Sequence, residues 1–356
     1  MLIKKGKILL KAAVLKKIGA DLEIEELNIP ELSRGQILVD IKFSGICGAQ
    51  INQKKGIKLN KKFLPCLMGH EGAGVVSKIG PGVTKVKPGD HVVLHWRLSS
   101  GVESDFPTFY SYTSNQKIGA GLVTTFSDKS IISENRLTKI EKKYPLDIAT
   151  LLGCGVTTGI GIVQNELNAR ENSSFLIAGV GGVGLSTIIG ANLKYPSKVI
   201  AMDLDDEKLA FSKKIGSSHQ INILKEKNIV DLIFDITDNK GVNYAIDTTG
   251  NNKIINQLLD VLSAGGTLVL VGQPEKNKNL VITNFLKLYK GIYIFDSQGG
   301  LTNPDIDIPK ILKMHEKGII NLNSLINKKI RLENINEGFN LLEQHNFVGS
   351  RIIIEN

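Results

Sequence analysis

Short apolar runs, separated by Gly and Pro, fill most of the first 150 residues. Runs of this length with many β-branched residues are typical of strands. Pro30, Gly35 and Pro88 are among the residues that separate them. The regular spacing predicts a compact, barrel-like β domain. Its strands are expected at Ile8–Val14, Leu22–Leu27, Gln36–Phe43, Gly72–Ile79, His91–His95 and Ile131–Ile140.

From residue 156 to 298 strand-like and helix-like segments alternate, which is typical of an α/β fold with a doubly wound parallel sheet. We expect residues 156–298 to form one domain and residues 1–155, completed by 299–356, to form the other. Strands are predicted at Phe175–Ala178, Val199–Met202, Tyr244–Asp247, Thr267–Val271, Gly291–Phe295 and, in the tail, 351–354. Helices are predicted at Leu204–Ile215, Val230–Ile236, Asn252–Leu262, Asp307–Lys317 and Ile335–Gln344.

A glycine-rich turn follows the first strand of the second domain and opens a helix. Its glycines are Gly179, Gly181, Gly182 and Gly184. The first permits a tight turn, the second lets a pyrophosphate approach the backbone, and the last lets helix and strand pack closely. The helix start offers free N–H groups to phosphates. The pattern predicts a dinucleotide site.

Asp203 ends the next strand, 19 residues after the last glycine of the turn. An acid at this place accepts hydrogen bonds from a ribose 2′-hydroxyl. Because a carboxylate would repel a 2′-phosphate, Asp203 favours NAD over NADP. Lys208 is the nearest cation, and it either reaches the adenosine ribose or is solvated.

Composition narrows the classes of protein. The chain has 356 residues, 42% hydrophobic and 22% charged, which is ordinary for a globular protein. No apolar run approaches a membrane span, and no long apolar segment follows the basic N-terminus, so neither a membrane span nor a signal peptide is expected. Three cysteines point to a reducing cytoplasm. The net charge of +9 comes from dispersed lysines without interleaved aromatic residues, so we expect no nucleic-acid partner.

Cys47, His70 and Cys154 are the candidate chemical residues of the β domain, and each is flanked by glycines. A Cys2His set leaves tetrahedral zinc one open position, which is the catalytic arrangement. Spacing does not establish the site, because the gaps are 23 and 84 residues. Taken singly, each cysteine is more often a small buried residue, and the histidine a hydrogen-bonded core residue.

Five stretches carry a resemblance to a known family: Gly69–Gly74, Val86–Val92, Gly153–Gly159, Gly179–Gly184 and Ile335–Phe339. The chain resembles a zinc-dependent medium-chain alcohol dehydrogenase over its whole length. The resemblance implies a GroES-like β-rich catalytic domain and a Rossmann NAD-binding domain. It also implies one catalytic zinc, held by Cys47, His70 and Cys154.

The resemblance assigns further roles residue by residue. Glu71 matches an acid beside the metal, and Thr158 a residue near the nicotinamide. Lys208 matches a residue near the adenosine ribose, and Arg351 an arginine near the pyrophosphate. Trp96 matches an aromatic wall of the substrate pocket, although a core residue at the end of a strand would give the same sequence pattern. The family also implies a homodimer or homotetramer, joined near Tyr289–Phe295.

The chain departs from the family pattern beside the first cysteine. Ala49 and Gln50 replace the usual hydroxyl residue and Asp, and Asn52 replaces a frequent histidine. The standard proton relay is therefore absent, and His95 or a substrate hydroxyl is an alternative route. The loop 97–121 lacks the four cysteines of a structural zinc, so none is expected there. Its Ser100, Glu103 and Asp105 stabilise the loop, or Glu103 and Asp105 contact substrate.

These observations predict a cytoplasmic, NAD-dependent oxidoreductase that acts on a small alcohol, a polyol or a sugar-derived alcohol. Two alternatives stay open at this point. The zinc centre serves a lyase-like reaction with transient use of NAD, or the chain is a non-catalytic NAD-binding protein.

Overall fold

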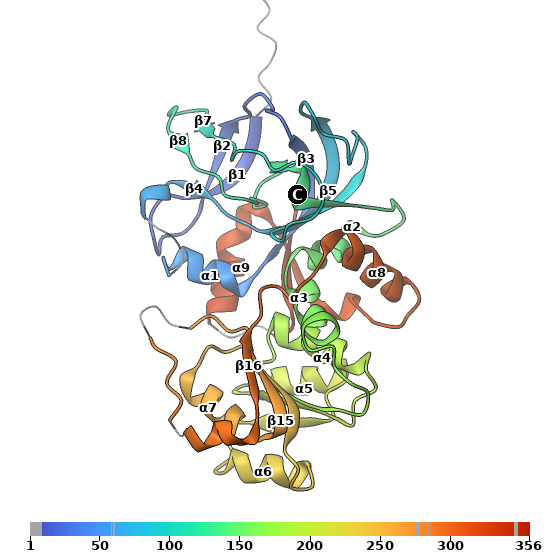
Figure 1. The fold of residues 1–356 in the computed structure, drawn as a ribbon. Coiled ribbons are helices and arrows are strands. Elements are labelled where there is room, and N and C mark those ends of the chain that lie inside the picture. The colour runs from blue at the N-terminus through green and yellow to red at the C-terminus, as the bar shows by residue number, and fades with distance from the viewer. Residues whose placement is uncertain (1–8, 58, 60, 275–277, 284, 345–347) are drawn as a thin grey trace, which may run out of the picture. The chain divides into compact units, whose positions relative to one another are not determined.

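The computed structural model describes all residues except 1–8, 58, 60, 275–277, 284 and 345–347. The chain divides into two compact units (Figure 1). Unit 1 comprises the described residues of Met1–Cys154, Asn303–Phe347 and Arg351–Asn356, and unit 2 those of Gly155–Thr302 and Val348–Ser350.

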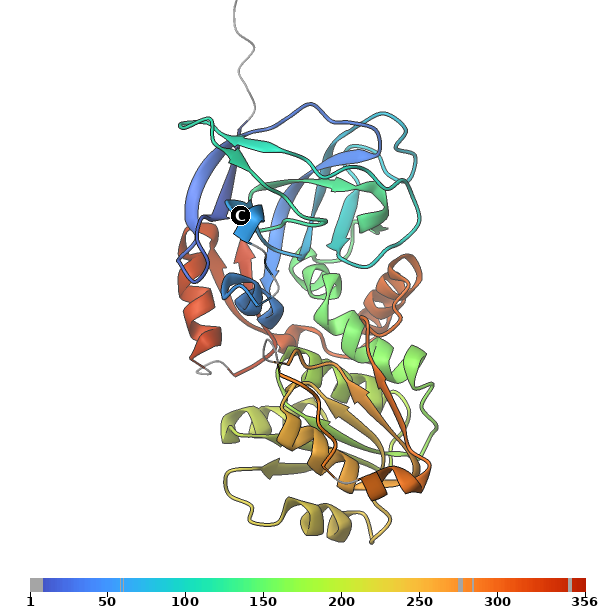
Figure 2. The same cartoon turned by 60° about the vertical axis from the view of Figure 1, so that its left-hand side comes forward.

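A six-stranded parallel sheet organises unit 2, and helices flank it (Figure 2). Its order is β13-β12-β11-β14-β15-β16, so the first strand of the unit, β11, lies centrally and the chain winds outward in both directions. This is the doubly wound arrangement that the alternation of strands and helices predicts. The strands are β11 (Ser174–Ala178), β12 (Lys198–Asp203), β13 (His219–Asn222), β14 (Val242–Asp247), β15 (Leu262–Leu270) and β16 (Tyr293–Asp296).

Local sequence signals set the ends of the unit 2 helices. The Asp205 side chain accepts hydrogen bonds from the backbone N–H groups of Glu207 and Lys208 and so begins α5. Gly216 ends that helix with φ of 121°. The helices are α3 (Gly155–Gly161), the π-helical turn η4 (Ile162–Glu166), α4 (Gly182–Asn192), α5 (Asp206–Ile215), α6 (Ile229–Ile236), α7 (Asn252–Asp260) and the 3-10 helix η5 (Phe285–Lys290).

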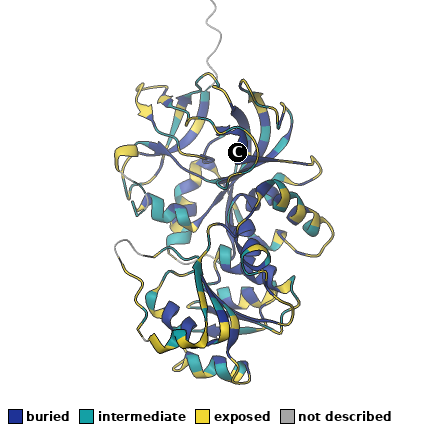
Figure 3. Ribbon diagram, in the orientation of Figure 1, coloured by how far each residue is buried: buried dark blue, intermediate teal, exposed yellow. Residues whose placement is uncertain are grey.

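Two β-sheets build most of unit 1. One has the order β4-β1-β2-β7-β8, and the other β10-β6-β5-β3-β18-β17 with β9 also paired to β3. Their inner strands are largely buried (Figure 3). The strands are β1 (Leu9–Leu15), β2 (Glu23–Asn28), β3 (Gln36–Ile46), β4 (Cys66–Leu67), β5 (Glu71–Ile79), β6 (His91–His95), β7 (Phe109–Ser111), β8 (Lys117–Ile118), β9 (Lys129–Ser133), β10 (Leu137–Ile140), β17 (Ile326–Arg331) and β18 (Arg351–Glu355).

The C-terminal segment completes unit 1. β18 pairs with β3, so Ile352 lies opposite Ile46, immediately before Cys47. α9 buries Phe339 in a core with Ile46 and Ile352. The helices are α1 (Gly48–Lys54), η1 (Lys61–Phe63), η2 (Glu134–Arg136), α2 (Leu146–Thr150), η3 (Leu151–Gly153), α8 (Pro304–Glu316), η6 (Asn323–Leu325), η7 (Leu332–Asn334) and α9 (Ile335–Glu343). The fold class is therefore the predicted one.

One predicted strand, Ile131–Ile140, is two strands with different neighbours. β9 pairs with β3 and β10 pairs with β6. Glu134 lies at the break, where its carboxylate accepts backbone N–H groups of Thr84, Lys85 and Val102 at 2.6, 2.6 and 2.8 Å. Those donors are remote in sequence, so local propensity does not reveal the break.

The segment 97–121, predicted as a loop, contains the two short strands β7 and β8. Its first part, residues 97–106, has no regular secondary structure and is held by polar contacts. Asp305 on α8 accepts both the backbone N–H and the hydroxyl of Ser100, at 3.0 and 2.6 Å. Lys85 pairs with Asp305 at 2.7 Å. Glu103 accepts a hydrogen bond from Asn135 at 2.5 Å. Ser100 and Glu103 therefore stabilise the loop, which was one of the two predicted roles.

His95 is a structural residue at the end of β6. Its side chain is 1% exposed, with Nδ1 2.8 Å from the Arg97 carbonyl oxygen and Nε2 3.0 Å from the Thr138 hydroxyl. Burial lowers the pKa of His95 to about 4. Because both ring nitrogens are engaged and the neutral form is strongly favoured, the structure contradicts the alternative that His95 relays a proton.

Among the described helices, no single one is long and apolar enough to cross a membrane. The bent pair Leu146–Gly153 and Gly155–Glu166 reaches that length and apolar composition only when its two helices are counted together.

Acid should destabilise the protein through His95. The unfolded chain binds a proton near pH 6.5, whereas the folded chain resists protonation until about pH 4. The contribution of His95 to the free energy of unfolding, ~3 kcal/mol, is therefore fully present above pH 6.5 and is lost as the pH falls toward 4. Urea unfolding between pH 7 and 4 measures the free energy of unfolding of the wild type and of His95→Gln, and we expect the difference between them to change over this range. A gap between the two proteins that does not change with pH would contradict this role.

Candidate metal centre

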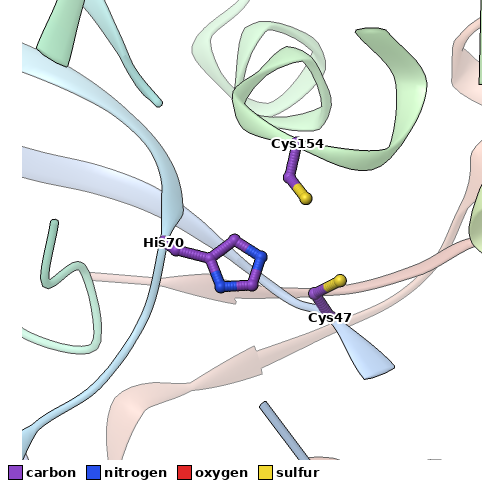
Figure 4. A group of neighbouring side chains, drawn as sticks. All are labelled: Cys47, His70 and Cys154. Carbon is purple, nitrogen blue, oxygen red and sulfur yellow. The ribbon is translucent and has the colours of Figure 1, made fainter. Parts of the chain in front are cut away.

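Cys47, His70 and Cys154 converge within unit 1. One Sγ or ring-nitrogen atom from each lies within 4.8 Å of the others. Figure 4 shows the imidazole with one nitrogen turned toward both sulfur atoms. His70 Nε2 is buried and has no hydrogen-bond partner among the described residues. The structure therefore brings together the three residues that the resemblance implied.

The segment around Thr125 fixes the turn that presents His70. The carbonyl oxygen of Met68 accepts the backbone N–H groups of Thr125 and Phe126, each at 3.1 Å. On the other side of His70, the Glu71 carbonyl oxygen lies 3.0 Å from the hydroxyls of both Ser44 and Thr125. The backbone on both sides of His70 is thus held by hydrogen bonds.

Cys154 lies at the end of η3, where the backbone leaves helical geometry with φ of −153° and ψ of −84°. The preceding Gly153 is in tight contact with β5 and β6. A Cβ at Gly153 would lie 2.6 Å from Glu71 Cβ and 2.6 Å from the Leu94 carbonyl oxygen. Because these distances are shorter than real Cβ contacts, only glycine lets Cys154 approach the other two ligand candidates.

A buried ion pair lies beside the three residues. Arg351 Nε donates to Glu71 Oε1 at 2.7 Å, and the two side chains are 3% and 0% exposed. Arg351 Nη2 also lies 3.9 Å from Cys47 Sγ. The guanidinium of Arg351 therefore contacts Glu71 and Cys47 in unit 1. Its predicted contact with a pyrophosphate stays a prediction.

The two thiols shift each other's pKa in opposite directions. A hydrogen bond from Cys154 lowers the pKa of Cys47 well below its usual range, and the same bond raises the pKa of Cys154. Burial lowers the pKa of His70, but the ionised Cys47 thiol beside it outweighs burial, so the net shift of the His70 pKa is upward. Burial raises the pKa of Glu71 against the opposing effect of Arg351.

These groups fit a divalent cation with a preference for sulfur and imidazole. With both thiols ionised, the two sulfurs and Glu71 carry three negative charges, and Arg351 offsets one of them. The remaining charge of −2 matches Zn²⁺. Two sulfurs and one imidazole nitrogen are a usual zinc ligand set that leaves a fourth position open. The unpartnered Nε2 of His70 also gains a partner in such a complex.

The glycine-rich turn of unit 2 has the predicted local geometry. Gly179 has φ of 85°. A Cβ at Gly184 would lie 1.9 Å from the Gly179 carbonyl oxygen, so only glycine permits this helix–strand packing. Asp203 ends β12, and its Oδ2 accepts the Val180 backbone N–H at 2.8 Å. Its Oδ1 accepts the Leu204 backbone N–H at 2.8 Å, so both carboxylate oxygens hold Asp203 at the turn.

The structure places the remaining residues that the resemblance implied, Thr158, Lys208 and Trp96, in the fold. Thr158 is buried on α3 and Lys208 is half-buried on α5, both in unit 2. In unit 1, Trp96 follows β6, and the Arg97 guanidinium lies 5.7 Å from its ring centre. Their contacts with cofactor or substrate stay predictions.

Three residues near the site were not predicted from the sequence to support it: Ser44, Gln50 and Thr125. Ser44 and Thr125 lie in unremarkable strand and loop segments, so no local signal marks them. Gln50 did carry one, because a glutamine three residues after a helix cap is half of a capping box. The cap here is Cys47, an unusual residue type for that position.

Known proteins resemble the chain over nearly its whole length. The family model "Alcohol dehydrogenase GroES-like domain" matches residues 33–142, and "Zinc-binding dehydrogenase" matches 182–332. The chain is 31% identical to an alcohol dehydrogenase class-2 isozyme of Oryctolagus cuniculus, with 96% of this chain and 97% of that protein aligned. It is 28% identical to an S-(hydroxymethyl)glutathione dehydrogenase of Paracoccus denitrificans, with 96% and 99% aligned.

A solved structure extends this similarity to the fold. The benzyl alcohol dehydrogenase of Acinetobacter calcoaceticus superposes with a TM-score of 0.87 at 27% identity. The superposition covers 98% of this chain and 99% of that one.

Removing one sulfur should release the metal. Cys154→Ala leaves two of the three ligands, and we expect zinc to be lost on dialysis while the circular dichroism spectrum stays that of the wild type. Cys66→Ala is the matched control, because Cys66 is also a free cysteine of unit 1 but lies outside the cluster. Metal analysis of both variants decides the point. Zinc retained by Cys154→Ala would show that the ligand set is wrong.

Proposed function

Because the chain belongs to the zinc-dependent medium-chain alcohol dehydrogenase family, we propose that it is an NAD-dependent oxidoreductase with one catalytic zinc. In the proposed reaction an alcohol and NAD⁺ give an aldehyde or ketone, NADH and a proton. The substrate is a small primary or secondary alcohol, a polyol or a sugar-derived alcohol.

One observation carries the proposal: the meeting of two sulfurs and the unpartnered His70 Nε2 within 4.8 Å, next to a buried ion pair. A structural zinc is usually enclosed by four protein ligands. In this cluster three residues offer ligand atoms, which leaves a position for substrate. The glycine turn with Asp203 in unit 2 independently supports the dinucleotide.

The residues of the chain have distinct tasks in this reaction. Cys47 and Cys154 hold the metal as thiolates, and His70 holds it through Nε2 as a neutral imidazole. When bound, zinc supplies a Lewis acid for the alcohol oxygen and NAD supplies the hydride acceptor. Arg351 neutralises Glu71, so the protein side of the centre keeps a charge of −2.

The proton of the alcohol leaves by a route that does not use His95, whose ring nitrogens are both hydrogen-bonded. Ala49 has no hydroxyl to pass it on, and Asn52 is no base at neutral pH. We therefore propose that a substrate hydroxyl or water carries the proton, which favours substrates with a second polar group near the reacting carbon.

We also propose that two copies associate through the edge of the unit 2 sheet. β16 is the terminal strand of the sheet, and no described strand pairs with its outer side. Exposed large apolar side chains gather on and before it; they are Leu280, Val281, Phe285, Leu286, Tyr289 and Tyr293. A second copy related by two-fold symmetry would cover both the edge and these side chains.

The function is tested by following NADH absorbance with purified protein and a panel of alcohols. The panel holds ethanol, a polyol, benzyl alcohol and S-(hydroxymethyl)glutathione, because relatives are named for the last two. We expect NADH to accumulate with at least one alcohol, to stop after chelation and to return with added zinc. Substrate turnover without accumulated NADH would instead support the lyase-like alternative, and tight NAD binding without zinc the non-catalytic one.

Asp203 should set the choice of cofactor. Asp203→Asn removes the charge that favours NAD and keeps a side-chain oxygen for the Val180 N–H, while its NH2 group no longer accepts the Leu204 N–H. Because a hydrogen bond to a charged group contributes about 1.5–3 kcal/mol, we expect NAD to bind at least ~10-fold more weakly. The preference for NAD over NADP should shrink as well. Fluorescence titration with NADH and NADPH measures both, and an unchanged preference would contradict the assignment of Asp203.

A charge on the sheet edge should prevent association. We expect the wild type to sediment as a dimer or tetramer and Tyr293→Lys to shift toward smaller species, because a lysine there is desolvated in the paired state. Tyr195→Lys, on another exposed tyrosine of unit 2, is the matched control. A Tyr293→Lys protein that sediments like the wild type would place the interface elsewhere.

A further inference from the structure

Gln50 is completely buried beside one of the candidate zinc ligands. Its side chain is 0% exposed. The side-chain oxygen accepts the backbone N–H of Cys47 at 3.0 Å. The side-chain nitrogen is buried and has no hydrogen-bond partner among the described residues. The polar contact that this amide makes is therefore directed at Cys47.

The contact belongs to a capping box at the start of α1. Cys47 is the cap residue, with extended backbone geometry of φ −102° and ψ 146°, and Gln50 is the third residue of the helix. In return, the backbone N–H of Gln50 faces the Cys47 side chain, and it donates to the Cys47 carbonyl oxygen at 3.0 Å. Such a box usually pairs a serine or threonine with a glutamate or glutamine. In this chain the capping side chain is a metal ligand candidate.

Cys47 is thus fixed from both sides of the chain. On the strand side, Ile46 pairs with Ile352 of β18. On the helix side, Gln50 holds the Cys47 N–H and limits how the β3–α1 turn can rotate. A rotation of that turn would swing the sulfur away from His70 and Cys154, which lie within 4.8 Å.

We propose that Gln50 is a positioning residue for Cys47: its amide oxygen locks the turn that aims the Cys47 sulfur at the zinc centre. The inference rests on the zinc centre of the proposed function. It assigns to Gln50 a neutral, geometric task, in contrast to the charged support that the family's aspartate would give at this position. A buried donor without a partner is unfavourable, and the amide oxygen gives the side chain its use here.

Stability and zinc affinity should therefore separate in Gln50→Leu. Leucine fills the space and removes the unpartnered nitrogen, but it leaves the Cys47 N–H without an acceptor. The variant thus loses one buried polar group without a partner, the Gln50 side-chain nitrogen, and gains another, the Cys47 N–H. The thermal midpoint of the protein without zinc should therefore change little. Without the lock, the sulfur loses its fixed direction, and zinc should bind ~10–100-fold more weakly, as for other residues that orient ligands.

The experiment measures zinc dissociation constants by competition with a chromophoric chelator, using the full chain. Gln50→Glu keeps an oxygen for the Cys47 N–H, and we expect its zinc affinity to stay within a few-fold of the wild type. Gln53→Leu on the same helix is the matched control and should leave zinc affinity unchanged. Gln50→Ala, which cannot overpack the site, replaces Gln50→Leu if the leucine variant does not fold.

A second readout uses Co²⁺ in place of zinc. The thiolate-to-cobalt charge-transfer band reports directly on the cysteine ligands, and it should weaken or shift in Gln50→Leu but not in Gln50→Glu. A purely structural role for Gln50 would change the thermal midpoint and leave this band and the zinc affinity alone.

The outcomes separate the two proposals. If the wild type binds zinc and Gln50→Leu binds it equally well, the positioning role is overturned and the proposed function stands. If Gln50→Glu binds zinc as weakly as Gln50→Leu, the capping oxygen is not what matters, and the inference is also overturned. A wild-type protein that binds no zinc would overturn the proposed function, and this inference with it.

Discussion

Two thiols and an imidazole lie within 4.8 Å of one another in unit 1, next to a fully buried carboxylate. Without a cation, such a cluster is unfavourable, because burial penalises each ionised sulfur and the negative charges repel one another. Within the chain itself, Cys154 lowers the pKa of the Cys47 thiol, and Arg351 pairs with the Glu71 carboxylate. A divalent cation resolves the repulsion fully, since it balances the remaining charge of −2.

The rest of unit 1 is arranged so that these groups can meet. β3 delivers Cys47 at its end, and β18 pairs alongside it and supplies Arg351. Gly153 removes the side chain that would keep Cys154 away from β5. Hydroxyls and backbone amides around Thr125 pin the turn of His70. The C-terminal segment is therefore part of the site as well as part of the fold.

Much of the architecture could be predicted from the sequence, because buried strands and glycine turns have local signals. The central strands of unit 2 and the turn at Gly179 follow from apolar runs and from glycines that only one packing permits. β13 (His219–Asn222) and β17 (Ile326–Arg331) were missed because their partly exposed, polar residues give no apolar run. The break at Glu134 was missed because its hydrogen-bond donors come from distant segments.

The candidate site was less accessible to such reasoning. Its three residues are separated by 23 and 84 positions, so spacing alone could not join them, and the resemblance to a family was needed. The residues that aim them were hidden for a different reason. Ser44, Thr125 and Gln50 act through single hydrogen bonds to backbone groups, which neither composition nor periodicity records. His95, in contrast, drew attention as a titratable residue and is a buried structural one.

X-ray absorption at the zinc edge of the purified protein tests the central claim most directly. The account predicts one zinc per chain, surrounded by two sulfur atoms at about 2.3 Å, one imidazole nitrogen and one further light atom. A chain without zinc, or a zinc ion with only oxygen and nitrogen neighbours, would contradict it.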